Sequence, residues 1–98
     1  MIVIVFRARV RNGAEAELER VGQRMYELAT AMPGFRSYKD FAAADGETLA
    51  LVEFDTLGSV DAWREHPEHL AAQHRGRNDF FTEYHIQVCT PVREHVFP

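Results

Sequence analysis

The chain has 98 residues, 15 acidic and 11 basic, and a net charge of −4. We expect one domain over residues 1–98 without the basic surface that binds nucleic acid. No apolar run approaches the ~20 residues of a membrane span, and the opening MIVIVF is too short for a secretory signal, so a cytoplasmic location is expected. The single cysteine, Cys89, excludes an intrachain disulfide and a thiolate metal cage.

The first predicted element is a strand at residues 2–11, where side chains alternate between two faces. One face carries Ile2, Ile4, Phe6, Ala8 and Val10, and the other carries Val3, Val5, Arg7 and Arg9. The turn Asn12-Gly13 then ends this strand.

A helix is predicted over residues 14–32, with Asn12 as its cap and Glu15 reaching back to it. Its apolar residues recur at helical spacing and should face a core. They are Leu18, Val21, Met25, Leu28 and Met32. Pro33-Gly34 ends the helix, because proline cannot continue it and glycine relaxes the turn.

Two strands and two short helical segments follow. Strands at 35–43 and 48–55 flank the hairpin signal Asp45-Gly46. Ser59 is expected to cap a helix at 59–65, and Pro67 is expected to open another at 67–76, which Gly76 ends. Residues 79–89 form a long strand, and 92–97 could form a short fifth one.

This order, β-α-β-β-α-β, predicts an α+β, ferredoxin-like sandwich: an antiparallel sheet with its helices on one face. Residues on the other face need a cover that one chain does not supply. The candidates are Val3, Val5 and Phe81, with Phe35 or Tyr38 depending on the register. Packing of two sheets in a homodimer would cover this face.

Three stretches resemble the antibiotic biosynthesis monooxygenase family of dimeric α+β barrels: MPGF at 32–35, AWREHPEHLAAQHRGR at 62–77 and FFTEYHIQV at 80–88. The resemblance implies two subunits joined through their sheets, each with a cavity between sheet and helices. One branch of the family oxidises aromatic polyketides with O₂ and no cofactor, and a second degrades haem. Others act on quinones or autoinducer-2, or have no established reaction.

The resemblance places Trp63 on the helix that lines the cavity. An indole offers an aromatic ligand a flat apolar wall and one N–H donor, although plain packing is the alternative role. His66 and His69 are candidate catalytic groups, since a neutral histidine can take a phenolic proton. Their spacing also permits metal binding, but Pro67 lies between them and no third ligand follows, so no metal site is predicted.

The residues of this chain favour a haem-binding site less than a site without a cofactor. In the haem-degrading branch the axial histidine falls ten residues after the tryptophan, where this chain has Gln73, and glutamine is a poor iron ligand. That branch also has an asparagine on the first strand, where Phe6 and Arg7 stand here. His74 comes one residue late and, with Arg75 and Arg77, is expected at an exposed helix end.

The predicted substrate-binding residues are Arg7, Tyr38, Gln73 and Tyr84. Arg7 is either an anion clamp or one half of an ion pair at the edge of the sheet. Tyr84 and His85 point to opposite faces of the last long strand, so at most one of them lines the cavity.

The expected function is cofactor-free oxygenation, by O₂, of a small aromatic or quinol compound in a homodimer. In this reaction a bound phenol ionises, its carbanion form passes an electron to O₂, and the radicals recombine. Two alternatives stay open. One is haem binding or degradation, and the other is a non-catalytic dimer that binds small molecules or serves a stress response.

Overall fold

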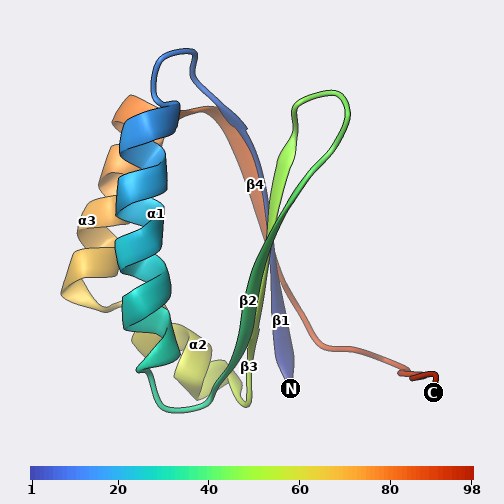
Figure 1. Cartoon of the computed structure of the whole chain (residues 1–98). Coiled ribbons are helices and arrows are strands. Elements are labelled where there is room, and N and C mark those ends of the chain that lie inside the picture. Colours follow the sequence, from blue (N-terminus) through green and yellow to red (C-terminus); the bar gives the residue numbers. More distant parts are fainter.

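A computed structural model describes residues 1–98. Four strands form one layer, and all helices lie on one side of it (Figure 1). In chain order the elements are β1 (Ile2–Val10), α1 (Glu15–Thr30), β2 (Phe35–Ala42), β3 (Thr48–Phe54), α2 (Leu57–Arg64), α3 (Pro67–Arg75), η1 (Gly76–Phe80, a π-helical turn) and β4 (Phe81–Cys89). This order confirms the predicted ferredoxin-like arrangement.

The sheet has the order β2-β3-β1-β4, and every neighbouring pair is antiparallel. Directly opposite residues share a face, so Val5 lies beside Leu51 on one side and Gln87 on the other. This face carries no helix, as Figure 1 shows. The predicted alternation of β1 is therefore confirmed, with Ile4 and Phe6 facing the helices.

Two bulges change the alternation elsewhere. The β1–β4 register skips Thr82, and the β2–β3 register skips Arg36. An extra residue moves the following side chains to the other face. Phe81 and Tyr38 therefore both line the cavity on the helix face, and Phe35 packs against the core. Their predicted place on the uncovered face was wrong.

The predicted helix caps also needed correction. Ala14, not Asn12, precedes α1, and Glu15 Oε2 accepts a hydrogen bond from Gly13 N at 2.8 Å. Gly13 has a φ of 88°, and the turn that it makes delays the start of the helix.

At α2 the cap is Thr56, whose Oγ1 accepts from Ser59 N at 3.1 Å. Ser59, the predicted cap, thus lies inside the first turn and donates to it. The helix starts two residues before the predicted position, at Leu57.

Pro67 interrupts the helical path between α2 and α3, as predicted, and is the first residue of α3. Gly76 ends α3 but does not end helical structure, because η1 continues to Phe80 and delays β4 to Phe81. Residues 92–97 form no strand, which corrects the predicted fifth one, and the chain after Cys89 leaves the sheet (Figure 1).

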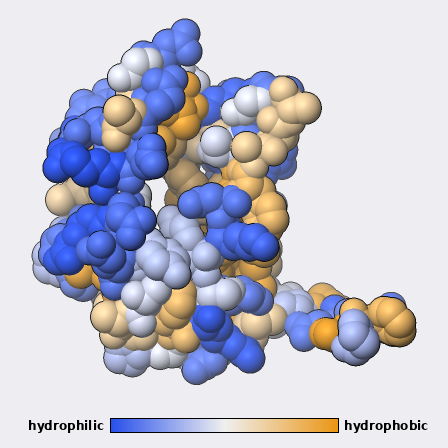
Figure 2. Space-filling model, viewed as in Figure 1, coloured by the Kyte–Doolittle hydropathy of each residue, from blue (hydrophilic) through white to orange (hydrophobic).

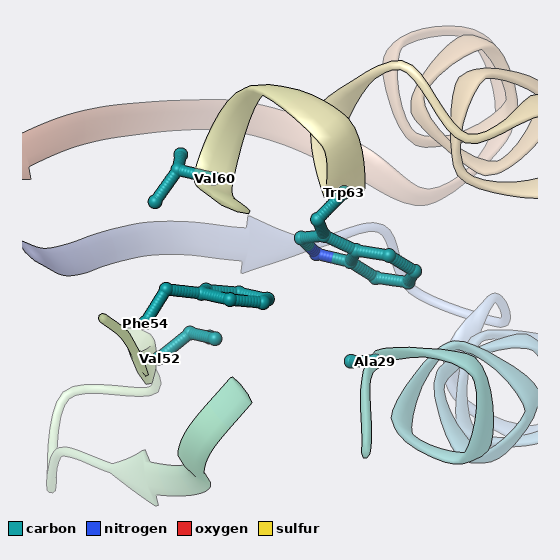
Figure 3. Close-up of a cluster of buried hydrophobic side chains, with 5 residues drawn as sticks. All are labelled: Ala29, Val52, Phe54, Val60 and Trp63. Carbon is teal, nitrogen blue, oxygen red and sulfur yellow. The ribbon is translucent and has the colours of Figure 1, made fainter. Parts of the chain in front are cut away.

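The core lies between β3, α1 and α2 at the end of the molecule near the Pro67 break. Its buried side chains are Ala29, Val52, Phe54, Val60 and Trp63, shown in Figure 3. Met25, Leu28 and Met32 of the predicted helix stripe pack against them. None of the helices combines the length and apolarity needed to cross a membrane.

Candidate functional site

A cavity of about 400 Å³ lies between the helices and the sheet, and 16 of its 22 lining residues are hydrophobic. Figure 2 shows a hollow between the two layers in the upper half of the view. Its apolar wall comes from β1, β3, β4, α1 and η1. The polar lining side chains are Tyr38, Trp63, Arg64, His69, Gln73, Arg77 and Tyr84. A cavity of this size and character suits a small aromatic molecule.

Trp63 forms the floor of the cavity where it meets the core. The residue is only 3% exposed, and its indole lies between α2 and the buried side chains of β3 (Figure 3). The indole N–H has no hydrogen-bond partner, while every fully enclosed side-chain nitrogen or oxygen has one. The N–H is therefore not fully enclosed, and because Trp63 lines the cavity it is a candidate donor to an oxygen of a ligand.

His69 stacks on Trp63. The two ring centroids lie 4.0 Å apart with an interplanar angle of 15°. Burial lowers the pKa of His69 below the ordinary 6.5, and nearby His66 lowers it further, although a hydrogen bond to the Trp63 carbonyl acts in the opposite direction. The imidazole is therefore neutral at physiological pH.

The same hydrogen bond fixes the tautomer of His69. Its Nδ1 lies 3.0 Å from the Trp63 carbonyl oxygen, which can only accept. Nδ1 consequently carries the ring proton, and Nε2 has a free lone pair. Since His69 lines the cavity, it brings a proton acceptor to an otherwise apolar wall.

His66 has a different place. Its Nδ1 accepts from Glu68 N at 3.1 Å, which makes it the N-cap of α3. The imidazole is 6.2 Å from the Trp63 ring by centroids, and His66 is not among the residues that line the cavity. The side chain holds the helix break at Pro67, which in turn sets the position of His69.

Two tyrosines line the cavity from the sheet. Burial, with a smaller contribution from Asp40, raises the pKa of Tyr38 to about 12. The Tyr38 hydroxyl forms no hydrogen bond within the chain and keeps its proton, so it can donate to a ligand. Tyr84 lies nearer the open side, 39% exposed, with its ring 5.6 Å from that of Phe6.

Gln73 lines the cavity and donates from Nε2 to the Arg64 carbonyl oxygen at 2.9 Å. The bond ties the end of α2 to α3. His74 lies outside the cavity, where its ring pairs with Asn78. The place of the axial histidine in the haem-degrading branch thus holds an amide bonded to the backbone, which does not fit an iron ligand.

Arg7 is on the uncovered face of the sheet, away from this cavity. It forms a hydrogen-bonded ion pair with Glu47, at 3.1 Å between Nη2 and Oε1. The structure thus brings together Tyr38, Trp63, His69, Gln73 and Tyr84 around one space, and places Arg7 and His66 outside it.

Two polar residues of the cavity were not among the predicted site residues, Arg64 and Arg77. The signal in the sequence for Arg77 is helical spacing from His69 through Gln73, which continues past Gly76 because η1 extends the helical path. The predicted helix ends at that glycine. No group of three or more His, Cys, Asp or Glu side chains is arranged to hold a metal ion.

The family model described as antibiotic biosynthesis monooxygenase matches residues 1–75. The uncharacterized protein YqjZ of Bacillus subtilis is 28% identical over 88 residues, covering 90% of this chain and 77% of that protein.

Two solved structures share the fold. Rv0793 from Mycobacterium tuberculosis superposes with a TM-score of 0.85 at 23% identity, covering 97% of this chain and 98% of that one. SnoaB, a cofactor-independent oxygenase from Streptomyces nogalater, has a TM-score of 0.81 at 20% identity, with coverages of 95% and 94%.

Proposed function

Since the chain belongs to the antibiotic biosynthesis monooxygenase family, we propose that it is a cofactor-independent monooxygenase of a small aromatic phenol or quinol. The observation that most supports this proposal is the neutral His69, which stacks on Trp63 and has its Nε2 lone pair available at an apolar cavity. The description of the structural neighbour SnoaB as a cofactor-independent oxygenase supports the same class of reaction.

In the proposed reaction His69 Nε2 takes the phenolic proton of the substrate. The indole N–H of Trp63 and the hydroxyl of Tyr38 are free donors that would stabilise the resulting oxyanion. The apolar wall excludes water, which strengthens these interactions and protects the carbanion form. His66 positions the helix break in this scheme and does not contact the substrate.

The electrons come from the substrate itself. Its carbanion form passes one electron to O₂, the two radicals combine into a carbon-bound peroxide anion, and the proton held by His69 returns to it to give a hydroperoxide. Loss of water from that adduct converts the attacked ring carbon into a carbonyl, so that one oxygen atom enters the product and the other leaves as water. The protein supplies proton transfer and electrostatic stabilisation, for which neutral His69 and protonated Tyr38 are suited.

Replacing His69 with glutamine is expected to lower kcat/KM for O₂ uptake about 10²–10⁴-fold, because the cavity loses its base. The measurement is oxygen consumption by chelator-treated protein with anthrone as substrate. His95→Gln is a matched control, since His95 lies in the exposed C-terminal stretch away from the cavity. A requirement for added haem or iron in the wild type would contradict the proposal.

The pH dependence of kcat/KM is a second test of His69 as the base. Because the pKa of His69 is lowered from 6.5, the base is free through the neutral range, and kcat/KM should fall only as the pH drops below 6.5 toward that lowered value. The acidic limb should be absent in His69→Gln. An acidic limb that starts well above 6.5 would assign the base to another group.

We further propose that the protein works as a homodimer joined through its sheets. The family resemblance implies this assembly, and the face without helices carries a row of partly exposed apolar residues. They are Val3, Val5, Leu49, Leu51 and Phe41, the last of them 45% exposed. Burying such a face is worth roughly 25 cal/mol per Å² of apolar surface.

Leu51→Glu is expected to convert the dimer to a monomer, since a carboxylate cannot be buried unpaired between two sheets. The monomer should stay folded, because residue 51 lies on the face without helices, where water solvates the new carboxylate once no partner sheet covers it. Analytical ultracentrifugation measures the change. Leu57→Glu, at an exposed residue at the start of α2, is the control that should leave the mass unchanged. A wild-type monomer would contradict this assembly.

A further inference from the structure

The formal charges that line the cavity are all of one sign. None of its lining residues is Asp or Glu, although the chain has 15 acidic and 11 basic residues. Arg64 and Arg77 are the only cationic side chains in that lining, since His69 is neutral. The cavity is therefore electropositive in a protein that is acidic as a whole.

These two arginines also differ from most others in the chain. Six arginines form ion pairs with carboxylates: Arg7, Arg9, Arg20, Arg24, Arg36 and Arg75. Neither Arg64 nor Arg77 does so, and neither side chain forms a hydrogen bond within the chain. Their guanidinium groups are free to bind a carboxylate, whose two oxygens match the planar fork of donors.

Both arginines are connected to Gln73, which also lines the cavity. Gln73 bonds to the backbone of Arg64, which brings the end of α2 against α3. Arg77 follows Gln73 by four residues, one helical turn farther along α3 and η1. Both arginines are exposed, whereas Trp63 is 3% exposed, so they lie at the rim and the indole lies at the floor.

We propose that the ligand of this cavity is an aromatic carboxylic acid, whose ring enters the apolar space and whose carboxylate remains at the rim with Arg64 and Arg77. This inference rests on the proposed function for the end of the ligand that reacts. It adds that the opposite end of the ligand carries a negative charge. The net charge of −4 would repel an anion, so the two unpaired arginines also supply the local attraction for its approach.

The test compares two ligands of equal size and shape, 2-naphthoate and the neutral 2-naphthamide, by isothermal titration calorimetry at low salt. The wild type should bind the carboxylate about tenfold more tightly, the effect of one or two charge-assisted hydrogen bonds. Arg64→Gln and Arg77→Gln should each reduce this preference about threefold and the double variant should remove it. Added salt should weaken the binding of 2-naphthoate and leave the binding of 2-naphthamide unchanged.

Arg11→Gln is the matched control, because Arg11 also lacks an ion pair and does not line the cavity. It should keep the full preference for the carboxylate. Equal binding of both ligands by the wild type, no binding of either, or a preference that survives the double variant would overturn the inference. Oxygen uptake with neutral anthrone is independent of this charge, so its failure would count against the proposed oxygenase and not against the arginine pair.

Discussion

Replacing Trp63 with alanine is expected to lower the free energy of unfolding by about 3–5 kcal/mol, which is among the largest costs of a single substitution. The side chain is 3% exposed and packs within the core cluster with Val60, Phe54 and Ala29. Its removal leaves a void beside the existing cavity and takes away the ring on which His69 stacks. Urea denaturation followed by circular dichroism measures the change.

Two further variants separate stability from chemistry. Trp63→Phe keeps an aromatic ring in the core and should cost less, but it removes the N–H donor and should still lower kcat. Leu70→Ala, at a side chain 49% exposed, should change stability by less than about 1 kcal/mol. If Trp63→Ala costs no more than Leu70→Ala, Trp63 is not part of the core.

The second large effect is expected at Gly34, where alanine should cost about 2–4 kcal/mol. Gly34 has a φ of 83°, a conformation that side chains disfavour. An added Cβ would also lie 2.3 Å from Ser59 Oγ and 2.9 Å from Ser59 Cβ. The turn after α1 thus packs against the first turn of α2 only because residue 34 has no side chain. Denaturation of the variant measures the loss.

The two causes at Gly34 can be told apart. Gly13→Ala faces a similar φ of 88° but open space, so it should show the backbone cost alone, about 1–2 kcal/mol. Combining Gly34→Ala with Ser59→Gly should recover the part due to overlap, seen as a coupling in a double-mutant cycle. Additive costs would contradict a contact between these two residues.

Much of this fold follows from local pattern. The bounds of the helices and strands were predicted within about two residues. The signals were the alternation of β1, the apolar stripe of α1, and the breaks at Pro33-Gly34 and Pro67. The order of the elements predicted the topology. The bulges could not be predicted in this way. An extra residue at Arg36 or Thr82 leaves no signature in apolar spacing, yet it decides that Tyr38 and Phe81 face the helices.

The sequence predicted only some of the residues that line the cavity, since Arg64 and Arg77 were missed and Arg7 and His66 lie outside it, and it did not predict their tautomers or ion pairs. Family resemblance and helical spacing indicated Trp63, His69 and Gln73, which the structure places around one cavity. The tautomer of His69 depends on a carbonyl six residues away, and the freedom of Arg64 depends on which carboxylates lie near other arginines. Such properties arise from pairings in three dimensions, which spacing along the chain does not encode.

The stacking of Trp63 on His69 has a spectroscopic consequence. Trp63 is the sole tryptophan, so all indole fluorescence of the protein comes from a ring that lies 4.0 Å from one imidazole. A cationic imidazole accepts an electron from an excited indole more readily than a neutral one and therefore quenches its emission. The fluorescence intensity of Trp63 should therefore report whether the neighbouring His69 is charged.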